Sequence, residues 1–183
     1  MNLLTDNTPD ILFAGGFKLR IKTDFILWVK FINALNEKDK KDVAIILHDI
    51  FGEIPNAVKE DDLLSAILNW LWSFDDTTKS NSKSGSNAKA FDFIMDGNVI
   101  FCELWEYFPH LMEKGLTFQQ GIELIKLLLN NEKTVLYHRA FARCGDFSKM
   151  SKEMKKYWQK ERAKYAIKMS EEDFDDVFSK AFF

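Results

Sequence analysis

The chain has 183 residues, the size of one ordinary domain or of two small ones. Hydrophobic residues make up 46% of it and aromatic residues 14%, which excludes a disordered chain and supplies a substantial core. A net charge of −3 and a pI near 5.7 argue against a dedicated nucleic-acid-binding protein.

Residues 10–23 carry the one pattern typical of β-strands. Two apolar runs flank Gly15 and Gly16, a pair that readily adopts the positive φ angles of a tight hairpin turn. In the second run apolar residues alternate with basic ones, so we expect one face to be apolar and the other wet. Because a two-stranded hairpin is marginally stable alone, helices should pack against it.

Three helices are predicted between Thr23 and Phe74, each with apolar residues at spacings of three and four. Thr23 is a suitable N-cap for the first helix. The second helix ends at Gly52, a residue that suits a left-handed C-cap. The third, over 61–74, is apolar on two edges, so we expect it to be central.

Residues 75–90, DDTTKSNSKSGSNAKA, are small, polar and low in complexity. This composition is typical of a flexible loop. The loop lies either inside one helical domain or between two domains. We favour the first alternative, because the segment before it offers only three short helices and a hairpin. The predicted organisation is one domain over 1–168 and an amphipathic acidic segment over 169–183.

A fourth helix, predicted to end near residue 107, contains several carboxylates. Asp92 and Asp96 stand one helical turn apart, and Glu103 and Glu106 follow them. Paired carboxylates can bind a divalent metal or perform acid–base chemistry. No third and fourth ligand is evident, however, and Asp92 is well placed to cap the helix. We therefore expect these residues to be structural.

Two further helices follow, and neither adds a catalytic motif. Thr117 and Gln120 form the capping box of the first, and the second ends at Gly145. The isolated cysteines Cys102 and Cys144 define no disulfide framework and no metal motif, so we expect buried or half-buried thiols. The N-terminus lacks the pattern of a signal peptide and no apolar run reaches membrane-spanning length, so we expect a cytoplasmic protein.

The last third of the chain is the most unusual. Ser151 is a suitable cap for a long helix, and residues 149–168 contain eight basic and two acidic residues, a net charge of +6. Met154, Trp158 and Tyr165 share one face of this helix, which would pack on the domain or on a partner helix. A basic helix with aromatic residues could instead bind phosphates.

The residues from Ser170 onward carry a net charge of −4 and apolar side chains at helical spacing. A helix this short is unstable alone in water, so we expect it to dock on its own domain or on another chain. Its near balance of charge with the basic helix argues further against a nucleic-acid partner. The predicted partner-binding residues are Met154, Trp158, Tyr165, Phe174, Val177, Phe178 and Phe182. We predict no catalytic residue, no metal site and no cofactor.

Several motifs occur together in an order that resembles one family. They are Thr23-Asp24-Phe25, Phe51-Gly52-Glu53-Ile54-Pro55, Phe91-Asp92-Phe93, Phe147-Ser148-Lys149-Met150-Ser151-Lys152, Lys155-Lys156-Tyr157-Trp158 and Lys164-Tyr165-Ala166. Over residues 10–168 this order resembles the bacteriophage "gene product fifteen" family, found in the tail modules of long-tailed phages and in prophages of Gram-positive bacteria. The chain departs from the family at Gly121-Ile122, where we associate the family with tryptophans, and in the acidic segment after Met169.

The resemblance implies a non-enzymatic tail assembly chaperone. Genes of this family lie between the major tail protein and the tape measure. The expected partners are therefore the tape-measure protein and a tail-tube or upstream chaperone protein, met in the host bacterial cytoplasm during virion assembly. Self-association stays open, and no membrane is expected.

Two alternative functions are a structural tail component retained in the virion and a nucleic-acid-binding regulator that uses the basic helix 149–168. Under each of them the predicted fold is the same. It is mostly α, with about seven helices, a small N-terminal β-hairpin and a protruding C-terminal helical arm.

Overall fold

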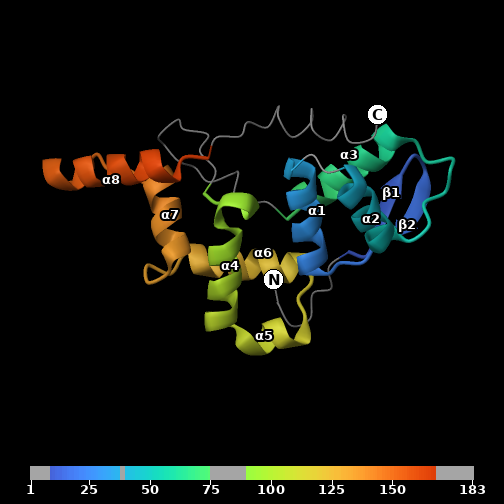
Figure 1. Cartoon of the computed structure of the whole chain (residues 1–183), viewed down its shortest axis with the longest axis horizontal. Helices are drawn as coiled ribbons and strands as arrows, with labels where there is room; N and C mark the ends of the chain where they lie inside the picture. The colour runs from blue at the N-terminus through green and yellow to red at the C-terminus, as the bar shows by residue number, and fades with distance from the viewer. Residues whose placement is uncertain (1–8, 38–39, 75–89, 168–183) are drawn as a thin grey trace. The chain divides into compact units, whose positions relative to one another are not determined.

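The computed structural model describes residues 9–37, 40–74 and 90–167 (Figure 1). Within them the fold is mostly helical with a small antiparallel hairpin, which confirms the predicted fold class. Eight helices lie in these residues, where about seven were predicted. No helix in this part of the chain combines the length and apolar character needed to cross a lipid bilayer.

The described residues gather in two compact units. The first contains the residues up to 74 and residues 110–123, and the second contains residues 90–109 and 124–167. A single domain over 1–168 stays a prediction. Almost all of the predicted loop, and the acidic segment from 169 onward, lie outside the described residues.

The hairpin has the predicted turn. Strand β1 (Ile11–Ala14) pairs antiparallel with β2 (Phe17–Arg20). Gly15 and Gly16 have φ angles of 55° and 83°, values that glycine adopts without steric cost.

One face of the hairpin is buried and the other is open. Leu12 lies opposite Leu19 on the buried face, whereas Phe13 lies opposite Lys18 on the outer face and is 68% exposed. The predicted alternation is therefore confirmed for Leu19, but Phe17, beside the turn, is 38% exposed.

The helices of the first unit are α1 (Phe25–Glu37), α2 (Lys40–Phe51), α3 (Glu60–Trp72), most of α5 (Pro109–Lys114) and the first half of α6 (Phe118–Leu129). The short helix α5 was not predicted. The cap of α1 was predicted wrongly: the backbone N–H of Leu27 donates to Asp24 Oδ1 at 2.8 Å, so Asp24 caps the helix instead of Thr23. The carbonyl of Thr23 accepts from the backbone N–H of Phe118.

Aromatic rings form the core of the first unit. Trp28 is fully buried and stacks on Trp70 of α3, with ring centroids 4.4 Å apart. Phe118 lies 6.1 Å from Trp28 and 5.5 Å from Trp70. Both indole nitrogens are satisfied: Trp28 donates to the carbonyl of Lys22 and Trp70 to that of Pro9. Trp70 thus brings α3 into this core, and a central position for the whole helix stays a prediction.

The second unit contains α4 (Phe93–Tyr107), the second half of α6, α7 (Val135–Cys144) and α8 (Lys152–Tyr165). Asp92 caps α4 and Ser151 caps α8, as predicted. Helix α8 ends three residues before the predicted end at residue 168. Cys144 is half-buried, but Cys102 on α4 is exposed, contrary to prediction.

Candidate protein-binding surfaces

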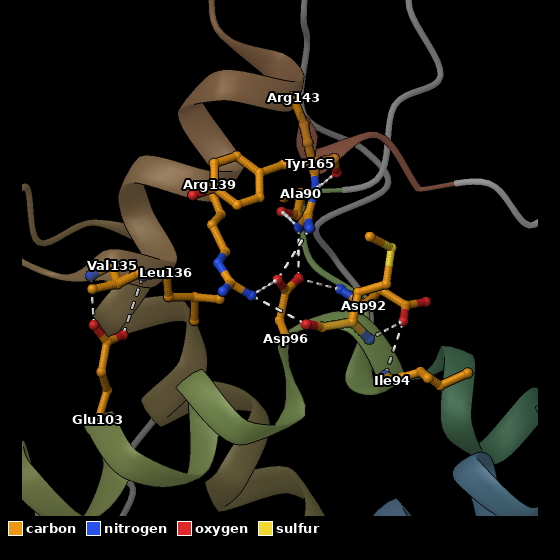
Figure 2. A network of polar contacts seen from close by, with 11 residues as sticks. Ala90, Asp92, Ile94, Asp96, Glu103, Val135, Leu136, Arg139, Arg143 and Tyr165 are labelled. Atoms are coloured by element: carbon orange, nitrogen blue, oxygen red, sulfur yellow. Dashed lines mark hydrogen bonds and ion pairs between the residues drawn. The ribbon is translucent and has the colours of Figure 1, made fainter. Parts of the chain in front are cut away.

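A fully buried carboxylate, Asp96, is the polar centre of the second unit (Figure 2). Arg143 of α7 forms a bidentate ion pair with it: Nη1 donates to Oδ2 at 2.6 Å, and Nη2 donates to Oδ1 at 3.0 Å. Arg139, one helical turn earlier, donates from Nη1 to Oδ1 at 3.0 Å. The two carboxylate oxygens thus receive charged donors from one face of α7, which joins α4 to α7.

The remaining donors of Arg143 extend this network along the chain. Its Nε donates to the carbonyl of Tyr165 at 2.6 Å, and its Nη1 donates to the carbonyl of Ala90 at 3.0 Å. The backbone N–H of Asp92 donates to Asp96 Oδ2 at 3.0 Å. One guanidinium therefore links the entry to α4, helix α7 and the end of α8.

The electrostatics of Asp96 are those of a structural ion pair. Burial by itself would raise the pKa of this carboxyl. The hydrogen bonds from Arg143, from the backbone N–H of Asp92 and from Arg139 outweigh burial, so the pKa lies below its usual range. Asp96 stays ionised, and its charge is neutralised within the protein.

Glu103 caps a helix far away in the sequence. It is 6% exposed, and its two carboxylate oxygens accept from the backbone N–H groups of Val135 and Leu136, at the start of α7. Thr134 adds a second cap by accepting from the N–H of Tyr137 at 3.1 Å. Among the described residues, no three His, Cys, Asp or Glu side chains gather where they could hold a metal ion.

Helix α8 packs on α7 with two of the predicted partner-binding residues. Trp158 is half-buried, with its ring centroid 4.9 Å from that of Phe141 and 6.0 Å from that of Phe147. Tyr165 is half-buried, and its ring lies 5.2 Å from the guanidinium carbon of Arg139. These side chains contact their own domain, one of the two alternatives that the sequence left open.

The other predicted partner-binding residues divide into two groups. Met154 is 46% exposed on α8 and contributes to its outer surface. The remaining four lie outside the described residues: Phe174, Val177, Phe178 and Phe182. Partner binding by this whole set stays a prediction.

An exposed apolar surface that the sequence did not predict lies on α4. Ile94, Phe101 and Trp105 are 41%, 49% and 40% exposed, and the rings of Phe101 and Trp105 meet edge to face with centroids 6.4 Å apart. They stand at positions i, i+7 and i+11, which places them on one side of the helix. We call these three residues the α4 stripe.

Comparison with known proteins identifies no relative. No protein-family model, no curated protein and no solved structure matches the chain.

Proposed function

We propose that this chain is a non-enzymatic assembly chaperone of a phage or prophage tail, which binds apolar helices of the tape-measure protein and keeps them soluble in the host cytoplasm. The observation that carries the proposal is the exposed α4 stripe of Ile94, Phe101 and Trp105. The order of motifs that resembles the "gene product fifteen" family supports the choice of partner.

The shape of the α4 stripe suits a helical partner. Its first and last residues are 11 positions apart, about 17 Å along the helix axis. Aromatic and large aliphatic side chains are the usual anchors at the centre of protein interfaces. The stripe carries no charge, since the one residue that lies between its members on this side, Asn98, is neutral. An apolar helix of the partner, packed along α4, would cover these side chains.

Helix α4, which carries the stripe, is joined to α7 by buried polar contacts. At 100° per residue, Asp96 and Glu103 project from the side of α4 opposite to the stripe. There they join α4 to α7 through the ion pair with Arg143 and the hydrogen bonds to Val135 and Leu136. A surface held in this way loses little conformational entropy when a partner binds.

Co-expression with the tape-measure protein, whose gene the resemblance places beside the gene of this chain, tests the proposal. The wild-type chain should increase the soluble fraction of the tape-measure protein and co-purify with it. The double variant Phe101→Glu/Trp105→Glu should lose both effects, because two buried charges would face an apolar helix. Ile45→Glu changes an equally apolar and 61% exposed residue on α2, and should behave like the wild type.

Two results would contradict the proposal. One is a wild-type chain that neither co-purifies with the tape-measure protein nor raises its solubility. The other is a double variant, folded by circular dichroism, that protects the tape-measure protein as well as the wild type does. Mass spectrometry of purified particles addresses the alternative of a retained structural component, because a chaperone should be absent from finished tails.

A further inference from the structure

Four lysine side chains form a row along one side of α8. Lysines stand at every fourth position of this helix, and all four are exposed: Lys152, Lys156, Lys160 and Lys164. With a rise of 1.5 Å per residue, neighbouring lysines are separated by about 6 Å along the axis, and the row is about 18 Å long. We call these four residues the lysine row.

Packing of α8 on α7 leaves the lysine row uncovered. The contacts with α7 are made from the other side of α8, by Trp158 and by Arg162. Arg162 donates to the carbonyls of Ala142 and Gly145 at 2.9 and 2.7 Å. Within the row, Lys164 alone has a described ion pair, of 3.6 Å with the half-buried Glu161, and its Nζ lies 4.6 Å from the ring centroid of Tyr165.

Positive charge is concentrated in this part of the chain. Residues 149–167 contain seven basic and two acidic residues, a net charge of +5, whereas the whole chain carries −3, so the other residues carry −8. Like charges at i and i+4 destabilise a helix slightly. Lys152, Lys156 and Lys160 therefore repel one another along α8 and have no described role in its packing, which favours a role in binding an anionic partner.

The residue type indicates which anionic partner fits. Lysine is depleted at protein–protein interfaces, whereas lysine is a common donor to the phosphates of nucleic acids. Beside the row, Tyr157 is 53% exposed and offers a ring on which an unpaired base can stack. Charged groups together with a stacking platform are typical of surfaces that bind single strands.

We propose that the lysine row of α8, together with Tyr157, binds the phosphate backbone of single-stranded nucleic acid. The contact is confined to α8, because the acidic remainder of the chain repels phosphates. Binding is therefore independent of base sequence, of moderate affinity and strongly dependent on salt. The charge balance of the sequence argued against such a partner, but it did not reveal that the packing and the charged side chains of α8 occupy separate faces.

Fluorescence anisotropy of the full chain with a labelled single-stranded DNA tests the proposal. Four phosphate contacts predict that the affinity falls about 50-fold between 50 and 200 mM salt. The triple variant Lys152→Gln/Lys156→Gln/Lys160→Gln should lose most of the low-salt affinity and most of the salt dependence. The same three positions changed to arginine should retain both, since the charge is kept.

A matched control separates the lysine row from net charge. Lys18→Gln/Lys22→Gln/Lys30→Gln removes the same charge from exposed positions elsewhere in the chain and should bind DNA as the wild type does. Equal losses in the two triple variants, or an absence of wild-type binding at 50 mM salt, would overturn the proposal.

Tyr157 distinguishes nucleic acid from an acidic protein partner. Tyr157→Ala should weaken DNA binding about fivefold or more and leave the salt dependence unchanged, because stacking on an aromatic ring is largely independent of charge. Tyr157→Phe should retain the affinity. If poly-L-glutamate binds as tightly as DNA, and Tyr157→Ala affects neither, the row serves an acidic protein and the proposal is wrong.

Discussion

Asp96 is a charged residue in a position where most proteins place an apolar one. It is tolerated there because Arg143 and Arg139 supply three hydrogen bonds and compensate its charge. A buried ion pair of this kind adds little net stability, but removal of one partner leaves the other charge buried and uncompensated. The network is therefore sensitive to single substitutions.

We expect Asp96→Asn to destabilise the protein by about 3–5 kcal/mol, because Arg143, which is 4% exposed, would lose its counter-charge. Chemical denaturation followed by circular dichroism measures the difference. Glu106→Gln removes the same charge from an exposed position on α4 and should stay within about 0.5 kcal/mol of the wild type.

The pH dependence of that difference follows from the lowered pKa of Asp96. The stabilising contribution is fully present above the unfolded-state pKa of about 3.9, and is lost as the pH falls through the folded-state pKa. The difference in the free energy of unfolding between the wild type and Asp96→Asn should therefore be constant near neutral pH and should decrease below about pH 4. A difference that persists unchanged in acid would show that the carboxylate charge contributes little.

Gly121 lies where no side chain fits. A Cβ atom there would lie 2.1 Å from Cδ2 of Phe25, a residue that is 3% exposed. We expect Gly121→Ala to destabilise the protein by about 1–3 kcal/mol through overpacking. Gly97→Ala is the matched control: it also changes a helical glycine, but its Cβ meets no atom within 4 Å, so it should be neutral or stabilising by up to about 1 kcal/mol. Thermal denaturation of the two variants and of the wild type measures these differences in stability.

The sequence predicts interactions between residues that are close in the chain, but it does not predict those between residues far apart in the chain. The caps formed by Asp92, Ser151 and the Thr117–Gln120 pair were predicted because each involves residues at most four positions apart. The arginine partners of Asp96 lie 43 and 47 positions away. The available signal was the spacing of Arg139 and Arg143, which places two cations on one face of a predicted helix.

At the scale of elements, helix α7 depends on a cap from another helix. Glu103→Ala would leave the N–H groups of Val135 and Leu136 without their acceptor and remove a negative charge from the helix N-terminus. We expect a loss of about 1–3 kcal/mol, with a smaller loss for Glu103→Gln, which keeps an acceptor. Glu106→Ala on the same helix should have little effect, and urea denaturation of the three variants would compare them. Equal effects of Glu103→Ala and Glu106→Ala would contradict this role.

The location of α4 was predicted, but its exposed face was not. Asp96, Glu103 and Glu106 project from one side of this helix, so its sequence marks that side as the solvent-exposed one and the opposite, apolar side as buried. The buried positions include Ile100 and Leu104, but also Asp96 and Glu103, which a hydrophobic pattern assigns to the surface. The contacts of these two carboxylates with α7 bury their side of α4 and leave the α4 stripe exposed on the opposite side.

At the scale of the whole molecule, two compact units share one continuous helix, α6. We expect them to unfold together, as the prediction of one domain requires. Asp96→Asn weakens the second unit, so it should also accelerate hydrogen exchange of the most protected amides of α1 and α3 in the first unit. Faster exchange confined to the second unit would instead indicate two domains that unfold independently.

The contact between Phe25 and Gly121 also has an evolutionary consequence. In this chain the bulky side chain stands on α1 and the small one on α6. A homologue with a tryptophan at the second position can keep the same packing only if the first position becomes small. The two positions should therefore covary in an alignment of homologues, with the larger side chain on one helix or the other.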